Sequence, residues 1–236
     1  MKLSAIIPAR LNSKRLPQKV LKKINDIPMI EHVRRKIVLS KMFDDVTVVT
    51  SDLKIKQIIE KYNGKVIINK NKHFSGTSRS SEIVNKIEGD VIVIIFADEL
   101  LISLEQIKQY CISIKKDKTS ECWNATAMIN EKDLLDDNIV KCEVNKENFI
   151  KYFSRKKIKL SSKNKIVKSV GMISFKKNFL IKYSKLNKTK NEKETKIEQF
   201  RILDNDYSIK SIYLKKVYNS INTYRDFKYA LKFFKN

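Results

Sequence analysis

Residues 3–19 read LSAIIPARLNSKRLPQK, a short apolar run followed directly by a loop that carries four cations within ten residues. The apolar part, Leu3–Pro8, predicts a buried first strand. The loop suits a triphosphate, because guanidinium groups bind phosphate oxygens in bidentate fashion and lysine adds a movable point charge. It is not a P-loop, since it contains no glycine. A basic surface loop is the alternative, but Pro17 stiffens the segment and we favour phosphate binding.

Beyond this strand, the first half of the chain alternates strand and helix patterns. Val91–Phe96 is a continuous apolar run, typical of a central parallel strand. Ser103, with Gln106 three residues later, predicts a capping box at the next helix. The alternation predicts an α/β fold with a doubly wound, mostly parallel nucleotide-binding sheet whose ligands lie at the carboxyl ends of the strands. The other elements expected here are a helix over 28–37, a strand over 46–50, a helix over 55–62 that stops at Gly64, a strand over 66–68 and a helix ending over 82–87.

The pattern changes after Trp123, where strand patterns follow one another without long helices between them. We interpret residues of about 124–175 as an antiparallel extension or insertion within one domain of residues 1–236. It would serve as a dimerisation arm, so a homodimer is the expected assembly. The polar stretch 182–196 predicts a mobile surface loop. The strands are expected over 124–129, 139–144, 149–153, 166–175 and 209–214, and the helices over 197–203 and from Thr223.

Charge is the strongest compositional feature, since 50 Lys and Arg against 26 Asp and Glu give a net charge of +24. Such an excess suits a polyanionic partner. The lysines are scattered, however, and form no stripe interleaved with aromatic residues, so we expect no nucleic-acid partner. No run approaches the roughly 18 apolar residues of a membrane helix, so we expect no stable membrane insertion. Cys111, Cys122 and Cys142 have no metal-ligand spacing, which suits buried, reduced thiols in a cytoplasmic protein.

Two acidic residues, Asp98 and Glu99, directly follow the expected central strand. Such carboxylates can simply cap the next helix, but Ser103 already fills that position. Asp98 is therefore expected to face the cleft, where a carboxylate beside phosphate oxygens suits a hard divalent cation. A direct role for Glu99 stays open.

Four blocks of the sequence carry a family resemblance. They are the opening segment Ile6–Lys19, then HFSGTSR at 73–79, YFSR at 152–155 and EQFR at 198–201. The opening segment is shared by a wider superfamily. The other three resemble the HxSGTxR, FSR and EQLR blocks of the 3-deoxy-manno-octulosonate (Kdo) cytidylyltransferases. All four follow the family order over nearly the whole chain.

The resemblance implies an Mg²⁺-dependent enzyme that joins CMP from CTP to Kdo or a related acidic sugar. It would release pyrophosphate and serve lipopolysaccharide or other surface polysaccharide synthesis. The implied catalytic residues are Arg10, Arg15, Lys19 and Asp98. The implied nucleotide-binding residues are Ala9, Arg10, Ser13, Arg15, Lys19, Ser75, Gly76 and Arg79. The implied sugar-binding residues are Arg155, Glu198 and Gln199, and the implied metal ligands are Asp98 and Asn222.

The sequence departs from the family at positions that the resemblance places around the sugar. Phe96-Ala97 stand where the family has Gln-Gly, and Ser169 and Ile173 replace a His and a Tyr. Losing such hydrogen-bonding groups would cost about 1–3 kcal/mol for each unpaired partner. Either the sugar differs from Kdo or other groups of this chain bind it.

The metal position departs as well, because Asn222 replaces the Asp of the family's Val-Asp-Thr-Pro block. An asparagine can coordinate through its carbonyl oxygen but brings no charge. Asp226 is no substitute, because it lies three residues after Thr223, where it would serve a helix N-terminus. The alternatives are a nucleotide-binding paralogue without turnover and, less favoured, a nucleic-acid-binding protein.

Overall fold

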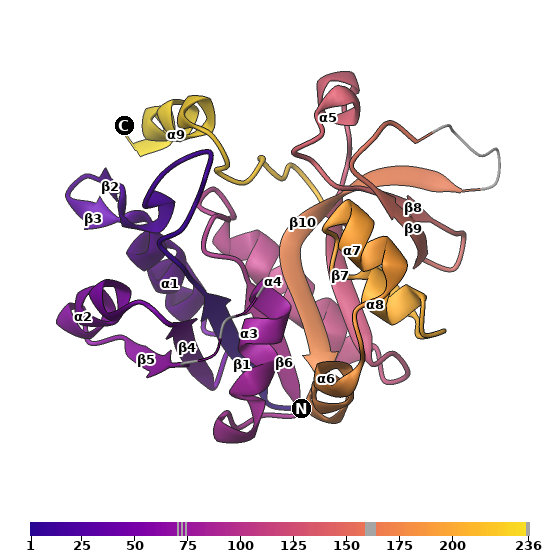
Figure 1. The fold of residues 1–236 in the computed structure, drawn as a ribbon, viewed down its shortest axis with the longest axis horizontal. Helices are drawn as coiled ribbons and strands as arrows, with labels where there is room; N and C mark the ends of the chain where they lie inside the picture. Colours follow the sequence, from indigo (N-terminus) through magenta and orange to yellow (C-terminus); the bar gives the residue numbers. More distant parts are fainter. Residues whose placement is uncertain (70, 72, 74, 159–163, 235–236) are drawn as a thin grey trace.

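A nine-stranded sheet forms the centre of the computed structural model, which describes residues 1–69, 71, 73, 75–158 and 164–234. Its strand order is β5-β4-β1-β6-β10-β7-β11-β9-β8, and Figure 1 shows the part from β5 to β7. The four strands that the first half contributes to this sheet pair with one another in parallel, which confirms the predicted parallel sheet. They are β1 (Leu3–Pro8), β4 (Asp45–Thr50), β5 (Lys65–Ile68) and β6 (Val91–Ile95).

The central strands send alternate side chains into two separate cores, because successive residues of a strand point to opposite faces. Ile7 and Val93 belong to the first core, and Ile6 and Ile94 to the second. Helices on both faces cover these cores, which is the predicted doubly wound arrangement. The first core is covered by α1 (Met29–Leu39), α2 (Leu53–Lys61) and α4 (Leu104–Lys116), and the second by α6 (Lys177–Lys185) and α8 (Phe200–Leu203).

Helix boundaries follow the capping chemistry more closely than the apolar pattern. The predicted capping box of α4 is confirmed, since Ser103 Oγ accepts from Gln106 N at 3.2 Å and Gln106 Oε1 accepts from Ser103 N at 2.9 Å. Gly64 does not stop α2 as predicted. Asn63 takes the left-handed conformation there, with φ 54°, because an asparagine tolerates that region of the backbone.

The third helix is shorter than predicted. It is α3 (Gly76–Glu82), and it ends where the expected helical segment 82–87 begins. A separate 3₁₀ turn, η2 (Val84–Lys86), follows it. Phe74, which belongs to the HFSGTSR block, lies outside the described residues.

The second half of the chain continues the sheet with mainly antiparallel pairing. β10 (Lys165–Lys176) is twelve residues long, so its last part pairs with β6 while its first part reaches β8 (Lys141–Val144). The antiparallel pairing is therefore confirmed, but this segment is not separate from the main sheet. Its use as a dimerisation arm stays a prediction. The other strands are β7 (Cys122–Ala127), β9 (Phe149–Ser154) and β11 (Ile209–Leu214), of which β11 runs parallel to β7.

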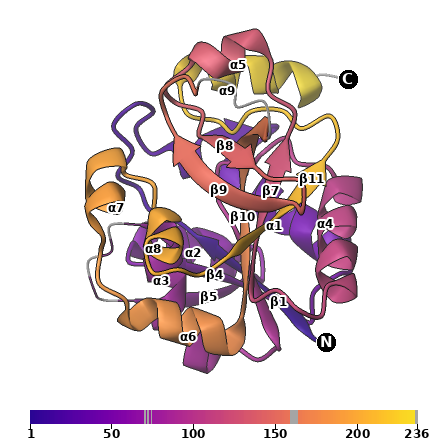
Figure 2. The same cartoon turned by 90° about the vertical axis from the view of Figure 1, so that its right-hand side faces the viewer.

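The polar stretch 182–196 is not the predicted mobile loop. It contains the end of α6 and the whole of α7 (Lys190–Thr195), which lies next to α8 (Figure 2). Glu192 of α7 is buried and pairs with Arg201 of α8, Oε1 to Nη2, at 2.5 Å. The prediction was wrong because the composition reflects the exposed faces of these helices, whereas one buried ion pair holds α7 on the protein. Helix α8 begins only at Phe200, three residues later than expected.

The remaining elements are short. The predicted terminal helix is α9 (Tyr224–Leu231), and Thr223 and Asp226 form its capping box, as Asp226 was predicted to do. The three cysteines are free and buried. No helix within the described ranges has the length and apolarity needed to cross a lipid bilayer. The other elements are η1 (Lys19–Leu21), β2 (Lys23–Ile24), β3 (Ile27–Pro28), α5 (Glu131–Leu135) and η3 (Lys232–Phe234).

Candidate active site

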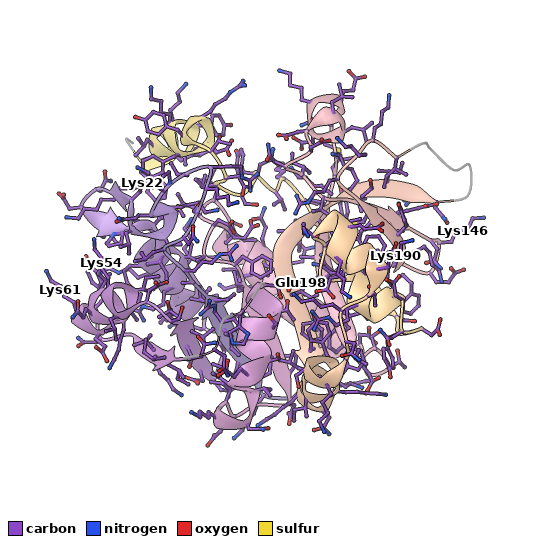
Figure 3. All side chains as sticks on the ribbon, viewed as in Figure 1. Lys22, Lys54, Lys61, Lys146, Lys190 and Glu198 are labelled. Carbon is purple, nitrogen blue, oxygen red and sulfur yellow. The ribbon has the colours of Figure 1, made fainter. Side chains whose placement is uncertain are left out.

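A cavity of about 610 Å³ lies beyond the carboxyl ends of β1 and β6, beside β10, the strand that connects β6 to the strands of the second half. Figure 3 shows Glu198, one of its lining residues, in the middle of the molecule between the two halves. The thirteen residues named above as implied catalytic, nucleotide-binding, sugar-binding or metal-binding residues all line this one cavity, although the role of each stays a prediction. They are Ala9, Arg10, Ser13, Arg15, Lys19, Ser75, Gly76, Arg79, Asp98, Arg155, Glu198, Gln199 and Asn222.

The basic loop is held over the cavity by its own backbone. Ala9 N donates to Val49 O at 2.9 Å, and Leu11 N donates to Asp52 Oδ2 at 2.9 Å. Asp52 stands at the N-cap position of α2 but makes no side-chain cap hydrogen bond, so its carboxylate serves the loop instead. Arg10 has no hydrogen bond or ion pair with the described residues and lines the cavity. Its guanidinium is therefore free to bind phosphate.

Two of the other three loop cations, Lys19 and Arg15, contact the expected metal ligands. Lys19 Nζ lies 2.7 Å from Asp98 Oδ2. Arg15 Nη2 donates to Asn222 Oδ1 at 3.0 Å, and Arg15 Nη1 donates to Asn138 Oδ1. The backbone brings the two expected ligands together, since Ile221 N donates to Asp98 O at 3.0 Å. The residues far apart in sequence thus meet at one end of the cavity.

This end of the cavity fits a magnesium ion held mainly by its substrate. No group of three or more His, Cys, Asp or Glu side chains suited to a metal occurs in the described part of the chain. Asp98 offers one carboxylate and Asn222 one amide oxygen. Mg²⁺ commonly uses one or two carboxylates together with substrate phosphates and water, so this donor set is sufficient when a triphosphate is present.

Glu99 lies behind Asp98 and holds the wall of the cavity. It is 3% exposed, and its Oε1 accepts from Gly171 N at 2.9 Å. Burial, followed by the charge of Asp98, raises the pKa of Glu99 to about 7. A side chain at position 171 would collide with the Glu99 carboxyl group. Glu99 therefore fixes β10 against the end of β6, which is a structural task.

The start of α3 forms the wall beside the basic loop. Ser75 Oγ accepts from Ser78 N at 3.2 Å and so caps the helix. A Cβ on Gly76 would lie 2.6 Å from the Phe96 ring and 3.0 Å from the Pro8 ring. Glycine is thus required there by packing, whereas the sequence suggested a close approach to a ligand. Burial lowers the pKa of Arg79, whose Nη1 donates to Asn69 Oδ1 at 2.8 Å.

The expected sugar-binding residues also line the cavity, and Glu198 contacts the start of α3. Glu198 accepts from Thr77 N at 3.2 Å and from Thr77 Oγ1 at 2.8 Å, and burial raises its pKa. Gln199 Nε2 donates to Asn124 Oδ1 at 3.3 Å. Arg155 donates only to main-chain carbonyls within the described residues, the nearest being Thr195 O at 3.3 Å from Nε. Its positive charge therefore has no carboxylate partner there.

One position expected to line the sugar lies elsewhere. Ile173 is 2% exposed and belongs to the second core, so the prediction that it lines the sugar is wrong. Ile173 lies in the part of β10 that pairs with β6, opposite Ile94, whereas Ser169 directly follows the part that pairs with β8. Ser169 and Phe96 do line the cavity.

Sequence reasoning missed several lining residues of the second half. Asn138, Lys168 and Asn219 all line the cavity and belong to none of the family blocks. Asn124 lies beneath the wall and bonds to Ser169 Oγ through Nδ2 at 3.0 Å. A polar residue within an expected strand, 124–129 or 166–175, was the available signal for Asn124 and Lys168, whereas Asn138 and Asn219 had none.

The fold and the site together define a nucleotidyltransferase. A solved structure of CMP:2-keto-3-deoxy-manno-octonic acid synthetase complexed with CTP superposes with a TM-score of 0.91 at 26% sequence identity, covering 99% of this chain and 98% of that one. A 4-diphosphocytidyl-2C-methyl-D-erythritol synthase from Anaerococcus prevotii, with a TM-score of 0.65 and 13% identity, covers 100% of this chain and 99% of its own and shares the fold alone.

Sequence comparison identifies the family. The sequence model of the cytidylyltransferases matches residues 4–212. The 3-deoxy-manno-octulosonate cytidylyltransferase of Francisella tularensis subsp. novicida is 35% identical over 217 residues, which is 86% of each chain. That of Fusobacterium nucleatum is also 35% identical, over 89% of this chain and 87% of its own. The chain belongs to the 3-deoxy-manno-octulosonate cytidylyltransferase family.

Proposed function

We propose that this chain is an Mg²⁺-dependent enzyme that joins CMP from CTP to Kdo or a related 2-keto-3-deoxy sugar acid and releases pyrophosphate. It would act in the cytoplasm as a homodimer and serve lipopolysaccharide or other surface polysaccharide synthesis. One observation carries the proposal. A single cavity is lined by the cations of the basic loop and by the guanidinium of Arg155, and Arg15 and Arg155 lie near enough to each other that both bond to Asn138. This group of cations suits a triphosphate and a sugar carboxylate bound next to each other.

In this reaction the protein mainly positions the two substrates and stabilises the charge on the phosphates. The anomeric hydroxyl of the sugar attacks the α-phosphorus of CTP. The new O–P bond forms while the bond to the bridging oxygen breaks, the hydroxyl proton is released, and pyrophosphate leaves. Arg10 and Arg15 would neutralise the charge that develops on the leaving group, because fixed cations in a shielded site stabilise such charge strongly. Lys19 would orient the same phosphates from beside Asp98.

Asp98 and Asn222 would hold the magnesium ion. When bound, Mg²⁺ would polarise the phosphate oxygens as a Lewis acid. Asp98 would supply a charged oxygen and Asn222 a neutral one. Arg15 donates to Asn222 Oδ1 in this structure, and a phosphate of CTP would replace Asn222 as the partner of Arg15. The arrangement supports weaker metal binding than two carboxylates would give.

Asn222→Asp should tighten Mg²⁺ binding to the CTP-loaded protein by about tenfold, since a charged ligand replaces a neutral one. Calorimetric titration with MgCl₂ measures this directly. Asn63→Asp, at an exposed position after α2, is the control for the added charge. An unchanged titration curve for Asn222→Asp would remove residue 222 from the metal site.

Arg155→Ala should raise the KM for the sugar acid by about tenfold or more and leave the KM for CTP nearly unchanged, because a charge-assisted bidentate contact to the carboxylate is lost. Lys156→Ala is the neighbouring control, since Lys156 is 82% exposed and pairs with Asp137. A larger rise in the KM for CTP would place Arg155 on the nucleotide.

The experiment that tests the proposed function is pyrophosphate release with CTP, Mg²⁺ and a panel of acidic sugars that includes Kdo. Release with Kdo is the expected result. Release only with another sugar would assign the changes at Phe96 and Ser169 to specificity. Asn222 favours a second candidate, a nucleotide-binding paralogue without turnover, and CTP binding with no release across the panel would support it.

A further inference from the structure

Three polar side chains form a closed hydrogen-bonded ring in the wall of the cavity. Lys168 Nζ lies 2.9 Å from Asp133 Oδ2 and 2.5 Å from Asn219 Oδ1. Asn219 Nδ2 donates to Asp133 Oδ1 at 2.9 Å. The ring joins β10, α5 and the segment that leads from β11 to Asn222. It thus ties together three separate parts of the chain on the sugar side.

Two N–H donors of the ring have no acceptor among the described residues, one on Asn219 Nδ2 and one on Lys168 Nζ. Both carboxylate oxygens of Asp133 accept bonds within the ring, and the amide of Asn219 both donates and accepts there. An ammonium group has three N–H donors, and Lys168 uses two of them. No acceptor for the third occurs among the described residues. Lys168 is 6% exposed and lines the cavity, so this donor is left for whatever the cavity holds.

The charge of Lys168 indicates which group it would bind. Its Nζ is compensated by the Asp133 carboxylate, whose side chain is 7% exposed, so the pair presents a donor without net charge. Arg155, with no carboxylate partner in the described residues, is the group suited to an anion. Arg155 therefore suits a carboxylate, and Lys168 suits a neutral hydroxyl group.

Ser169, the residue after Lys168, increases the importance of the third Lys168 N–H for binding the sugar. Ser169 stands where the family has a histidine, and its hydroxyl already accepts from Asn124 Nδ2 at 3.0 Å. The sugar side of this chain therefore has a serine hydroxyl at position 169 in place of the longer imidazole. Lys168, adjacent on β10 and also in the cavity wall, has a donor to spare.

We infer that Lys168 binds a hydroxyl group of the sugar acid through its third N–H, with Asp133 and Asn219 as positioning residues. The inference rests on the proposed function and names a residue that sets its sugar specificity. Because a buried pair that loses one partner leaves an uncompensated charge, Lys168→Met alone is at risk of misfolding. The double variant Lys168→Met/Asp133→Leu removes both charges and is the principal variant.

The test measures binding of Kdo and of CTP separately by calorimetry. In the double variant, Kdo binding should weaken by about tenfold or more, since a charge-assisted hydrogen bond is lost, and CTP binding should not change. A set of monodeoxy Kdo analogues then locates the hydroxyl. The analogue that lacks it should bind wild type and variant equally. Lys177→Met is the control, because Lys177 Nζ bonds to Ile87 O away from the cavity.

Two results would overturn the inference. One is unchanged Kdo binding in the double variant, and the other is an equal loss of Kdo and CTP binding, which would indicate a structural role. Turnover reports the proposed function independently. A wild-type protein that binds Kdo but releases no pyrophosphate contradicts the proposed catalysis and still decides the role of Lys168. Failure of the wild type to bind Kdo or any other acidic sugar of the panel contradicts both.

Discussion

Asp98→Ala should reduce pyrophosphate release by about a thousandfold while the protein stays folded. The loss is expected because Asp98 is the charged oxygen ligand proposed for Mg²⁺, and such charge stabilisation contributes several kcal/mol to the transition state. The fold should survive, since the Asp98 side chain is 25% exposed and its ion pair is with Lys19, which also borders the cavity. Lys19 lines the cavity, so its ammonium group can still be solvated when Asp98 is removed.

A matched control lies at the other end of the same strand. Asp90 precedes β6, its side chain is 66% exposed, and its Oδ2 accepts from Lys2 N at 2.7 Å. Asp90→Ala should keep full turnover. Asp98→Asn separates charge from shape and should lose nearly as much activity as Asp98→Ala. Near-normal turnover of both Asp98 variants would end its assignment as a metal ligand.

The part of the fold that could be predicted from the sequence rests on local patterns. The apolar runs of β1, β4 and β6, the capping residues Ser103 and Thr223 and the basic loop each act within a few residues. Such signals fix the order of strands and helices in the first half. A parallel sheet then places the ends of β1 and β6 at one edge, so the loop and Asp98 had to meet.

The missed features depend on contacts between distant residues. Lys168 meets Asp133 across 35 residues and Asn219 across 51, so no local pattern marks the ring. Ile173 is placed in the second core by its pairing with Ile94 of β6, which the sequence of β10 alone does not reveal. The fully buried Lys141 bonds to the carbonyls of Asp136 and Arg155, although a lysine in a strand pattern normally indicates an exposed face.

The polar stretch 182–196 is ordered although its composition predicts a mobile loop, and one buried ion pair accounts for the difference. Arg201 Nε and Nη2 bind Glu192 Oε2 and Oε1 at 2.7 and 2.5 Å, and the guanidinium lies 4.7 Å from the Tyr183 ring centroid. The two charged side chains are 5% and 7% exposed. A bidentate geometry of this kind orders both helices that carry it.

Arg201→Met should therefore lower the free energy of unfolding by about 3–5 kcal/mol, because Glu192 is left buried and charged without its partner. For a chain of this size the melting temperature should fall by roughly 10 °C. The exposed pair Lys56–Glu60 supplies the control, and Lys56→Met should change stability by about 0.5 kcal/mol or less. Calorimetric melting curves measure both.

The double variant Arg201→Met/Glu192→Leu shows whether the stability of Arg201→Met falls because Glu192 loses its ion-pair partner or because side-chain packing is lost. It should recover most of the stability, since no uncompensated charge remains in the interior. Limited proteolysis within 186–196 should be rapid in Arg201→Met and slow in wild type and double variant. If Arg201→Met instead melts like Lys56→Met and wild type is already cleaved rapidly there, the pair does not hold α7, and the mobile loop predicted from composition would be correct.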